Sequence, residues 1–570
     1  MNSKYFFAVL ATLLILWGGV AITRHTWSSW LAGDIQTMNT LRYWSRDGIG
    51  THYGLFMTQG YTPFVKIFES QELNQHAMSS VRKTPSGLVQ SIYYNHFPGG
   101  YLLPLYFLSG IVGVSTEIPF QIFQYTLSLL SLFFLYLFLK EVFNKQWTAQ
   151  LGTVLYASSW LFLNFSFTLA NQPIDDLLRF VLLWLIVQNP EKQKIPYKNF
   201  LIFFLYAILC ISSLDSILFI LAFTVLYHIL ITKKWHWKEW FILGAIAFVA
   251  RVAQLAQSAA AWGIQGALQD IGYSFSQRAT ETGPVSFYLL AKQRVYGTTL
   301  EWLKTISYSN HSNLLRFSLA IAVLVYCALL IKIYWKSDAE KKRVLTIVGI
   351  LAVAGSTFVL LVPVPGYMQY EGRQWLPCLL MATLAGFSWF LEEKQEKKRT
   401  VEQCLIGAFS IAYMIFVLST GLQTVRTSHP LYAFPEGGPS SPEKLLAEKI
   451  GAYSTAKNEL VIFYDPAQKI RQNLPVEKEG FVYQLSSYLA YYSDRFLLGD
   501  TTKEATLRDM EAINAATKGK VQFIILAENP EDTKEILGLW SNTCGQTKET
   551  PSVASLDGWS AVRTSSCEAL

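Results

Sequence analysis

Eleven apolar segments divide this sequence, most of them long enough to cross a lipid bilayer as helices. About 20 apolar residues in a helix span the hydrocarbon core. With 51% hydrophobic and only 15% charged residues among 570, the chain is too apolar to be one soluble domain. It is therefore predicted to be a polytopic α-helical membrane protein with about 11 transmembrane helices. The predicted spans are residues 5–22, 118–139, 149–170, 175–187, 199–212, 216–232, 239–257, 314–333, 344–364, 375–391 and 401–421.

Basic residues decide the orientation of these spans. If segment 97–114, which is rich in glycine and proline, does not cross, 17 Lys and Arg fall on one side and only Arg373 lies in the short loops opposite. The positive-inside rule places the 17 in the cytoplasm. We therefore expect a cytoplasmic N-terminus and an outer C-terminus, with 97–114 as a re-entrant or interface helix. The inner loops contain Lys140 and Lys145; Lys192, Lys194 and Lys198; Lys233, Lys234 and Lys238; Lys332, Lys336, Lys341, Lys342 and Arg343; and Lys394, Lys397, Lys398 and Arg399.

The same topology explains the net charge of +7, so no nucleic-acid partner is expected. The run 5–22 is either a signal peptide or a first membrane anchor, and its length favours the anchor. Three regions then face outward: a first loop over about 24–119, a second over about 258–313, and the tail after residue 422.

The tail changes composition at HPLYAFPEGGPSSPEK, a linker typical of a domain boundary. Beyond it, ELVIFYD and VQFIILAE indicate buried strands, and residues 483–492, 503–516 and 532–540 indicate helices. We therefore expect a transmembrane domain over 1–421 and an extracytoplasmic α/β domain over 422–570. Cys544 and Cys567 lie in that tail, where a disulfide is favoured over two free thiols if the compartment is oxidising. No C-x-x-C spacing indicates a metal site.

The first loop is closed by NHFPGGYLLPLYFL, which resembles a segment of the GT-C superfamily of polyprenyl-phosphate-dependent glycosyltransferases. Protein O-mannosyltransferases and lipid A aminoarabinose transferases belong to it. There the segment is close to HPPLYYLLL or HFPPGYPLLL; here His96, Phe97, Pro98 and Tyr101 match, and Gly99 replaces a common second proline. Two later stretches, YASSWLFLNFSFTLANQPIDDLLRFVLLWLI and GYMQYEGRQWLPCLLMATLAGF, are similar to later spans of the family.

The resemblance implies a carboxylate at the membrane–water boundary that deprotonates the acceptor. Asp34, about eleven residues past the first helix, suits that role, and a solvated Asp or helix cap is the alternative. Asp175 or Asp176 would lie at the outer face and position donor or acceptor. A carboxylate also suits a helix N-terminus, and Arg179, three to four residues on, offers an intrahelical ion pair that would make the group structural.

The leaving phosphate requires positive charge at the outer face. Arg373, alone in the short outer loops, is the first candidate. Arg251 lies inside an apolar segment near its outer end and is the second, although an arginine there can snorkel to the interface. His96 is a candidate for binding phosphate or orienting a carboxylate. Tyr94 is a candidate sugar contact, with an interfacial aromatic as the alternative.

The sequence thus predicts a multi-pass glycosyltransferase of the bacterial cytoplasmic (inner) membrane. Its expected partners are a polyprenyl-phosphate-linked sugar, a glycan, lipid or protein acceptor, and membrane lipids, with no cofactor and no metal. An O-antigen ligase or polymerase is an alternative, but those proteins carry their large loop late. A transporter would favour paired repeats, which are not evident. The sugar and the acceptor are left open.

Overall fold

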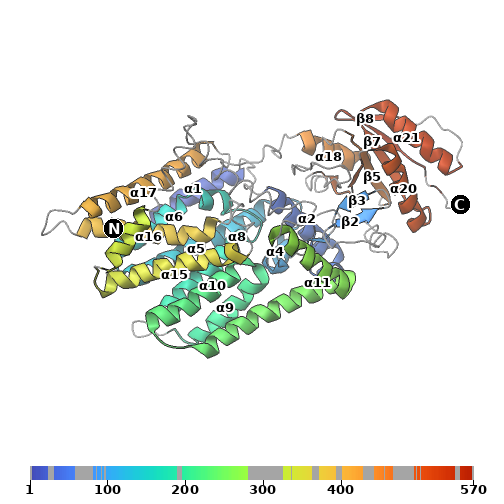
Figure 1. The fold of residues 1–570 in the computed structure, drawn as a ribbon. Helices are drawn as coiled ribbons and strands as arrows, with labels where there is room; N and C mark the ends of the chain where they lie inside the picture. The colour runs from blue at the N-terminus through green and yellow to red at the C-terminus, as the bar shows by residue number, and fades with distance from the viewer. Residues whose placement is uncertain are drawn as a thin grey trace, which may run out of the picture. The chain divides into compact units, whose positions relative to one another are not determined.

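The computed structural model describes residues 3–23, 31–57, 81–84, 87–90, 93–94, 98–188, 195–279, 325–335, 337–361, 372–392, 401–427, 442–454, 456, 458–466, 489, 493–495, 497–500, 502–545, 553–565 and 567. They form two compact units, coloured along the chain in Figure 1. Unit 1 comprises Met1–Ser29, Ile118–Val252 and Ser274–Ala433. Unit 2 comprises Trp30–Glu117, Ala253–Tyr273 and Phe434–Leu570.

Each of the eleven predicted spans contains helix in its described part. Four of them are long and apolar enough to cross a membrane by themselves: Ile118–Phe143, Trp237–Ala261, Arg373–Leu391 and Val401–Leu422. The helices are α1 (Ser3–Thr23), α5 (Ile118–Phe143), α6 (Gln146–Ala157), α7 (Trp160–Phe165), α8 (Gln172–Val187), α9 (Lys198–Ser212), α10 (Asp215–Tyr227) with a following π-helix (His228–Thr232), α11 (Trp237–Ala279), Val325–Trp335, α15 (Ala339–Leu361), α16 (Gly372–Glu392) and α17 (Val401–Thr427).

Two expectations for these segments are wrong. The outer loop expected from about 258 is helical as far as Ala279, with a break at Gly263, whose φ of 75° favours glycine. The span expected over 149–170 is two helices, α6 and α7. The Ser159 hydroxyl accepts the backbone N–H of Phe162 at 3.2 Å and so caps the start of α7. A Cβ at Gly421 would collide with the carbonyl oxygen of Ser158, so α17 packs tightly where the chain breaks.

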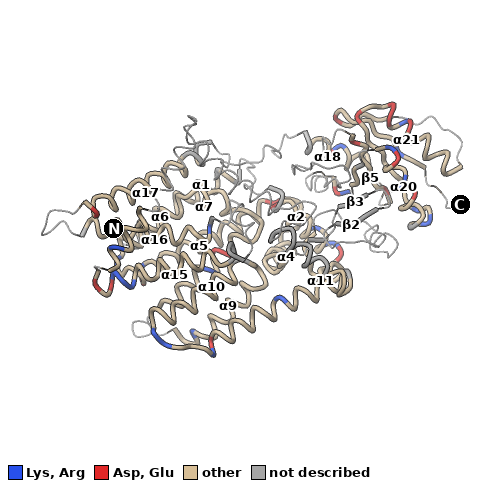
Figure 2. The backbone as a smooth tube through the Cα atoms, viewed as in Figure 1, with Lys and Arg blue, Asp and Glu red and all other residues tan. Residues whose placement is uncertain are grey.

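Four of the five loops that are predicted on one membrane face lie together at one end of unit 1. Glu141, Lys198, Lys234 and Arg343 come from four of these loops and line one cavity. Charged residues in unit 1 are few along the helices and gather near their ends (Figure 2). This shared end agrees with the predicted alternation of the loops after α5, whereas the number of crossings stays a prediction. The side of the membrane on which this end lies stays a prediction, because a crossing by 97–114 would invert all of these loops together.

Within unit 2, the first loop forms two helices that pack on each other. The hydroxyls of Ser45 on α2 and Ser109 on α4 hydrogen-bond at 2.7 Å, and the rings of Trp44 and Tyr106 meet edge to face. With 11 residues, α4 is only about 16 Å long, too short to cross the hydrocarbon core. This length agrees with a helix that does not cross. The elements are α2 (Leu31–Asp47), η1 (Ile49–His52), β1 (Phe56–Met57), β2 (Val81–Thr84), β3 (Gly87–Gln90), β4 (Tyr93–Tyr94), η2 (Gly99–Tyr101) and α4 (Leu102–Val112).

The tail forms an α/β fold around a five-stranded sheet of order β6-β5-β7-β9-β8. β5 pairs in parallel with β6 and β7, whereas β9 pairs antiparallel with β7 and β8. Alternate residues of the strands turn Val461 and Phe463 toward the buried side of α18, and the helices α20 and α21 pack on the sheet as well. The elements are α18 (Pro442–Tyr453), β5 (Glu459–Tyr464), β6 (Leu497–Asp500), α20 (Lys503–Thr517), β7 (Gln522–Ala527), α21 (Pro530–Thr543), β8 (Ala554–Leu556) and β9 (Trp559–Arg563).

Both predicted strands and two of the three predicted helices of the tail are present. The helix expected over 483–492 lies almost wholly outside the described residues. Cys544 and Cys567 are joined by a disulfide with a Cα–Cα distance of 5.4 Å. The expected boundary at 421/422 divides the chain into two consecutive domains, whereas each compact unit combines several separate segments. This boundary therefore stays a prediction.

The first loop and the tail belong to the same compact unit and contact each other. The Tyr43 hydroxyl on α2 donates a hydrogen bond to Asp494 Oδ1 at 2.9 Å, and an Arg42 nitrogen lies 3.5 Å from the same oxygen. Burial, together with the Asp494 charge, raises the pKa of Tyr43, which keeps the phenol protonated as the donor. The α2 helix is thus fixed to the α/β fold.

The disulfide generates a first prediction. Replacing both Cys544 and Cys567 by serine removes a cross-link between residues that are 23 positions apart. The larger chain entropy of the unfolded state should then lower the free energy of unfolding by about 3 kcal/mol. Thermal proteolysis of the full chain should show the tail cleaved at a lower temperature. Cys404→Ser, at an exposed free cysteine, is the control. Alkylation of both cysteines without reduction, or an unchanged cleavage temperature, would contradict the prediction.

Candidate functional site

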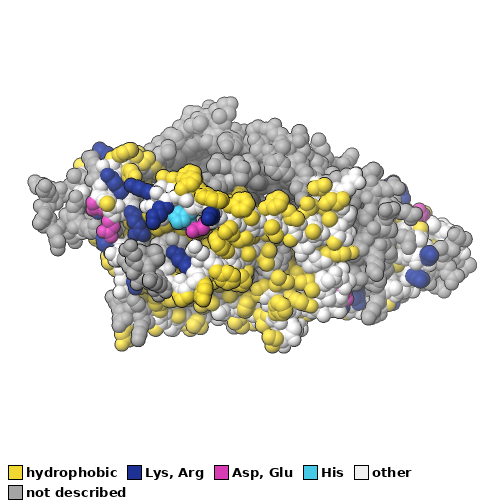
Figure 3. All heavy atoms as spheres, turned by 90° about the horizontal axis from the view of Figure 1, so that it is seen from below, with side chains coloured by type: hydrophobic (Ala, Val, Ile, Leu, Met, Phe, Trp, Pro, Cys, Tyr) yellow, Lys and Arg dark blue, Asp and Glu magenta, His cyan; other side chains and the backbone are white. Residues whose placement is uncertain are grey.

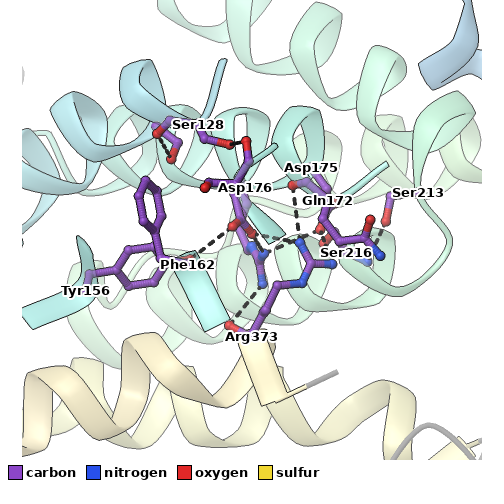
Figure 4. A network of polar contacts seen from close by, with 12 residues as sticks. Ser128, Tyr156, Phe162, Gln172, Asp175, Asp176, Ser213, Ser216 and Arg373 are labelled. Carbon is purple, nitrogen blue, oxygen red and sulfur yellow. Dashed lines mark hydrogen bonds and ion pairs between the residues drawn. The ribbon is translucent and has the colours of Figure 1, made fainter. Parts of the chain in front are cut away.

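Two carboxylates and two guanidinium groups form a buried cluster in unit 1. Asp176 Oδ1 lies 3.1 Å from Arg373 Nη1 and also contacts Arg179. Asp175 Oδ2 lies 3.4 Å from Arg179 Nη2 and 3.7 Å from Arg373 Nη2. Figure 4 shows Arg373 reaching from α16 toward the first turn of α8. Each carboxylate therefore meets both cations, and the formal charges of the cluster sum to zero.

Hydrogen bonds to uncharged groups extend the cluster to a third helix and to the backbone. The Tyr156 hydroxyl, on α6, donates to Asp176 Oδ2 at 3.1 Å. Arg373 Nη1 donates to the carbonyl of Gln172 at 3.2 Å, and Arg179 Nη1 donates to the carbonyl of Arg373 at 3.4 Å. Figure 4 shows Tyr156, Asp176 and Arg373 directed toward one another. The cluster thus ties α6, α8 and α16 together.

The environment of Arg373 differs from the sequence-based expectation. It was expected in a short outer loop, but it lies at the start of α16 with 3% of its surface exposed. The intrahelical ion pairs of Arg179 with Asp175 and Asp176 are present, as the spacing within α8 predicted. Two carboxylates already compensate the charge of Arg373, so binding a phosphate would require it to give up one of these contacts.

Some buried polar atoms near the cluster have no hydrogen-bond partner in the described part of the chain. They are Asp175 Oδ1 and both side-chain amide atoms of Gln172 and of Gln374. Gln374 directly follows Arg373 in the sequence, and the backbone carbonyl of Gln172 accepts a hydrogen bond from Arg373. Buried polar atoms normally find partners, so these three side chains can hydrogen-bond to water or to a polar ligand. The sequence analysis missed both glutamines, because neither carries a charge.

Asp34, the expected base, lies in the first turn of α2 in unit 2 and is fully buried. The alternative of an ordinary solvated aspartate is therefore wrong. Thr37 is one turn further along α2, and its hydroxyl lies 3.4 Å from that of Tyr101. Tyr101 belongs to the segment that closes the first loop, so both ends of this loop meet beside Asp34. The expected approach of Asp34 to Arg373 stays a prediction, since the two residues belong to different units.

A buried histidine lies beyond the other end of α2, in η1. His52 Nε2 lies 3.3 Å from Asp47 Oδ2, and its side chain is fully buried. Burial lowers the pKa of His52, and the Asp47 carboxylate offsets this only in part. At neutral pH the imidazole is therefore uncharged in the folded chain.

The remaining predicted site residues are dispersed. Arg251, on α11, donates to the carbonyl of Cys210 near the end of α9, where helix carbonyls lack intrahelical partners. This contact is structural, and a phosphate-binding role for Arg251 stays a prediction. Tyr94 pairs with Phe56 in the short ladder between β4 and β1. His96 lies outside the described residues.

One group of potential metal ligands occurs among the described residues. Atoms of His228, His236 and Glu239 lie within 4.8 Å of one another. His228 begins the π-helix after α10, His236 directly precedes α11, and Glu239 lies in the first turn of α11. All three line the cavity at the end of unit 1 where the predicted inner loops meet. They do not belong to the Asp175 and Asp176 cluster.

Comparison with known proteins gives weak similarities only. No protein-family model matches the chain, and no curated protein does. The apo crystal structure of ArnT from Cupriavidus metallidurans is similar at a TM-score of 0.42 and 11% identity, over 99% of this chain and 98% of that one. The apo Archaeoglobus fulgidus oligosaccharyltransferase is similar at a TM-score of 0.41 and 10% identity, over 92% of this chain and 71% of that one.

Both of these proteins are GT-C glycosyltransferases, the superfamily that the sequence motifs resemble. At such identities and TM-scores, the similarity assigns no activity and no site residue to this chain.

The buried cluster generates a second prediction. Arg373→Met leaves two buried carboxylates with one cation, and we expect it to destabilise the fold by about 3–5 kcal/mol. The control is Lys332→Met, which removes a partly exposed pair with Glu402 and should cost no more than about 1 kcal/mol. Thermal unfolding of the purified chain compares the two variants. Equal melting temperatures would show that the cluster does not hold the helices together.

A third prediction concerns pH. The folded-state pKa of His52 lies below its unfolded value of about 6.5. The contribution of His52 to the free energy of unfolding is therefore fully present above that pH. It is lost as the pH falls, because the unfolded chain binds the proton more readily. Acidification from about pH 7.5 to about pH 5.5 should lower the melting temperature of the wild type more than that of His52→Gln. Parallel pH profiles would contradict this.

Proposed function

We propose that this chain is an integral membrane glycosyltransferase that moves a sugar from a polyprenyl-phosphate or pyrophosphate donor to an acceptor at the outer membrane face. In this proposal it crosses the bacterial cytoplasmic membrane about 11 times, with the N-terminus inside and the α/β tail outside. The acceptor is a glycan, a lipid or a protein. The closing motif of the first loop and the environment of Asp34 support this assignment.

The observation that carries the proposal is the burial of Asp34 at the start of α2. Aspartates are rarely fully buried without a role in pairing or function. Asp34 follows the end of α1, at Thr23, by only eleven residues. This short connection keeps the carboxylate near the membrane boundary, where the phosphate of a lipid-linked sugar would lie. Thr37 is one turn beyond Asp34 on α2, and its contact with Tyr101 brings the segment that closes the first loop against this part of the helix.

In the proposed reaction, Asp34 accepts the proton of the acceptor nucleophile as the latter attacks the anomeric carbon. The bond from that carbon to the phosphate oxygen breaks, and the electron pair leaves with the phosphate. Positive charge must stabilise the leaving phosphate. Arg373, Arg251 and His96 are the proposed contacts, with Asp175, Asp176 and Tyr94 positioning the substrates.

The contacts around α8 suggest different roles for Asp175 and Asp176. Asp176 contacts Tyr156, Arg179 and Arg373, and this contact set suits positioning of helices. Asp175 keeps one buried oxygen without a described partner. We therefore expect a substitution at Asp176 to act mainly on stability and one at Asp175 to act more on turnover.

The fourth prediction tests the base. Asp34→Asn keeps the size of the side chain but cannot accept the proton, so transfer should fall about 10²- to 10⁴-fold in folded protein. Asp47→Asn, at the other end of the same helix, should retain transfer. The assay follows radiolabelled sugar from a panel of polyprenyl-phosphate sugars into envelope material, using membranes with and without the chain.

Equal transfer by the Asp34→Asn variant and the wild type would overturn the assignment of the base. Polymerisation or ligation of preassembled glycans, without transfer from any single-sugar donor, would favour an O-antigen ligase or polymerase. Movement of solute across proteoliposomes without any transfer would favour a transporter.

A further inference from the structure

A cavity of about 460 Å³ lies in unit 1, well away from the aspartate cluster. The helix α8 connects the two places: Asp175 lies in its first turn, whereas Ile186 and Val187 in its last turn line the cavity. Twelve residues of helix separate Asp175 from Val187, which is about 18 Å. The cavity is therefore a second site, at the end of the unit that is predicted to be cytoplasmic.

The lining of this cavity is basic on one side and apolar on the other. Lys198 begins α9, Lys234 lies between the π-helix and α11, and Arg343 lies in α15; Glu141 and Glu239 line the same cavity. The Lys198 ammonium donates to the backbone carbonyl of Gln188 at 3.0 Å, and the charges of Glu239 and Glu141 also act on it. The apolar wall consists of Ile186, Val187, Ile202, Phe203, Ile231 and Leu243.

His228 accepts a hydrogen bond through Nδ1, and this arrangement argues against a metal ion on its ring. The indole N–H of Trp240 donates to His228 Nδ1 at 3.0 Å. Because an indole nitrogen can only donate, Nδ1 must accept, and Nε2 of the neutral ring then carries the proton. A metal-bound histidine requires the opposite arrangement, with the second nitrogen donating. His236 Nδ1 meets Glu239 Oε1 at 3.2 Å, and the other oxygen of Glu239 lies 3.8 Å from His228 Nε2.

The backbone supports a built site at this place. The π-helix His228–Thr232 interrupts the regular helix, and Lys233 ends it in the left-handed conformation at φ 54°. The chain then turns back, and the Lys234 amide donates to the carbonyl of His228 at 3.3 Å. This turn brings a histidine and a lysine to the same cavity. Single π-turns of this kind are frequent at functional sites.

We propose that this cavity binds the phosphate headgroup of an anionic lipid, with Lys198, Lys234, Arg343 and His228 Nε2–H as donors and the lipid chains along the apolar wall. Basic pockets between helices at the cytoplasmic end suit such headgroups. Figure 3 shows Lys and Arg side chains gathered with a histidine beside a broad hydrophobic surface. Phe200, Phe204, Phe241 and Phe248 are exposed on α9 and α11, the helices that flank the cavity, and mark a surface for acyl chains.

The test measures lipid retention by the full chain purified in detergent. The probes are phosphatidylglycerol, phosphatidylcholine, inorganic phosphate and Zn²⁺, each added alone and followed by native mass spectrometry and by thermal stabilisation. We expect the wild type to retain phosphatidylglycerol over phosphatidylcholine. The double variant Lys234→Gln with Arg343→Gln should bind phosphatidylglycerol roughly 30-fold more weakly, as expected for two lost cation contacts.

The matched control is Lys238→Gln with Lys341→Gln, two basic residues of the same loops that do not line the cavity. It should retain phosphatidylglycerol like the wild type. Equal loss in both double variants, or none in either, would overturn the site. Stabilisation by inorganic phosphate at the affinity of the lipid would overturn a lipid ligand in favour of a free anion. Stoichiometric Zn²⁺ binding that is lost in His228→Gln would overturn the anion site in favour of a metal.

Discussion

The buried ion cluster at the starts of α8 and α16 is the interaction on which the helical unit depends most. Removing four charged groups from water costs several kcal/mol for each group, and this cost is offset only when every carboxylate meets a cation. Asp175 and Asp176 each contact both Arg179 and Arg373. The cluster therefore forms as a whole, and in doing so it sets how α16 meets α8. Residue Tyr156 adds α6 to the same arrangement.

The sequence could predict the part of this cluster that lies within one helix. Arg179 follows Asp175 and Asp176 by four and three residues, a spacing that makes the ion pair a local consequence of helix geometry. The contact of Asp176 with Arg373 spans 197 residues and depends on how two helices pack. Nothing in the local sequence encodes that contact. A charge pattern could mark Arg373 as unusual, but it could not distinguish an internal ion pair from a phosphate contact.

Hydropathy predicted where helices occur better than where they break. The segment 149–170 is apolar throughout, and two serines do not interrupt such a pattern. The break follows from a cap at Ser159 and from the close approach of Gly421, more than 250 residues away. In the tail the buried strands were predictable, because β5 and β7 are short apolar runs between polar turns. The burial of Asp34 was not predictable, since the local sequence of α2 does not show which distant segments pack on it.

The contact between Tyr43 and Asp494 has a consequence for biosynthesis. The two residues are separated by 451 positions, so the helix that carries Asp34 is made long before its partner in the tail exists. At translation rates of 5–20 residues per second, the interval is roughly 20–90 s. Throughout that time α2 lacks one of its fixed contacts. The contact that joins α2 to the α/β fold can therefore form only after residue 494 has been synthesised.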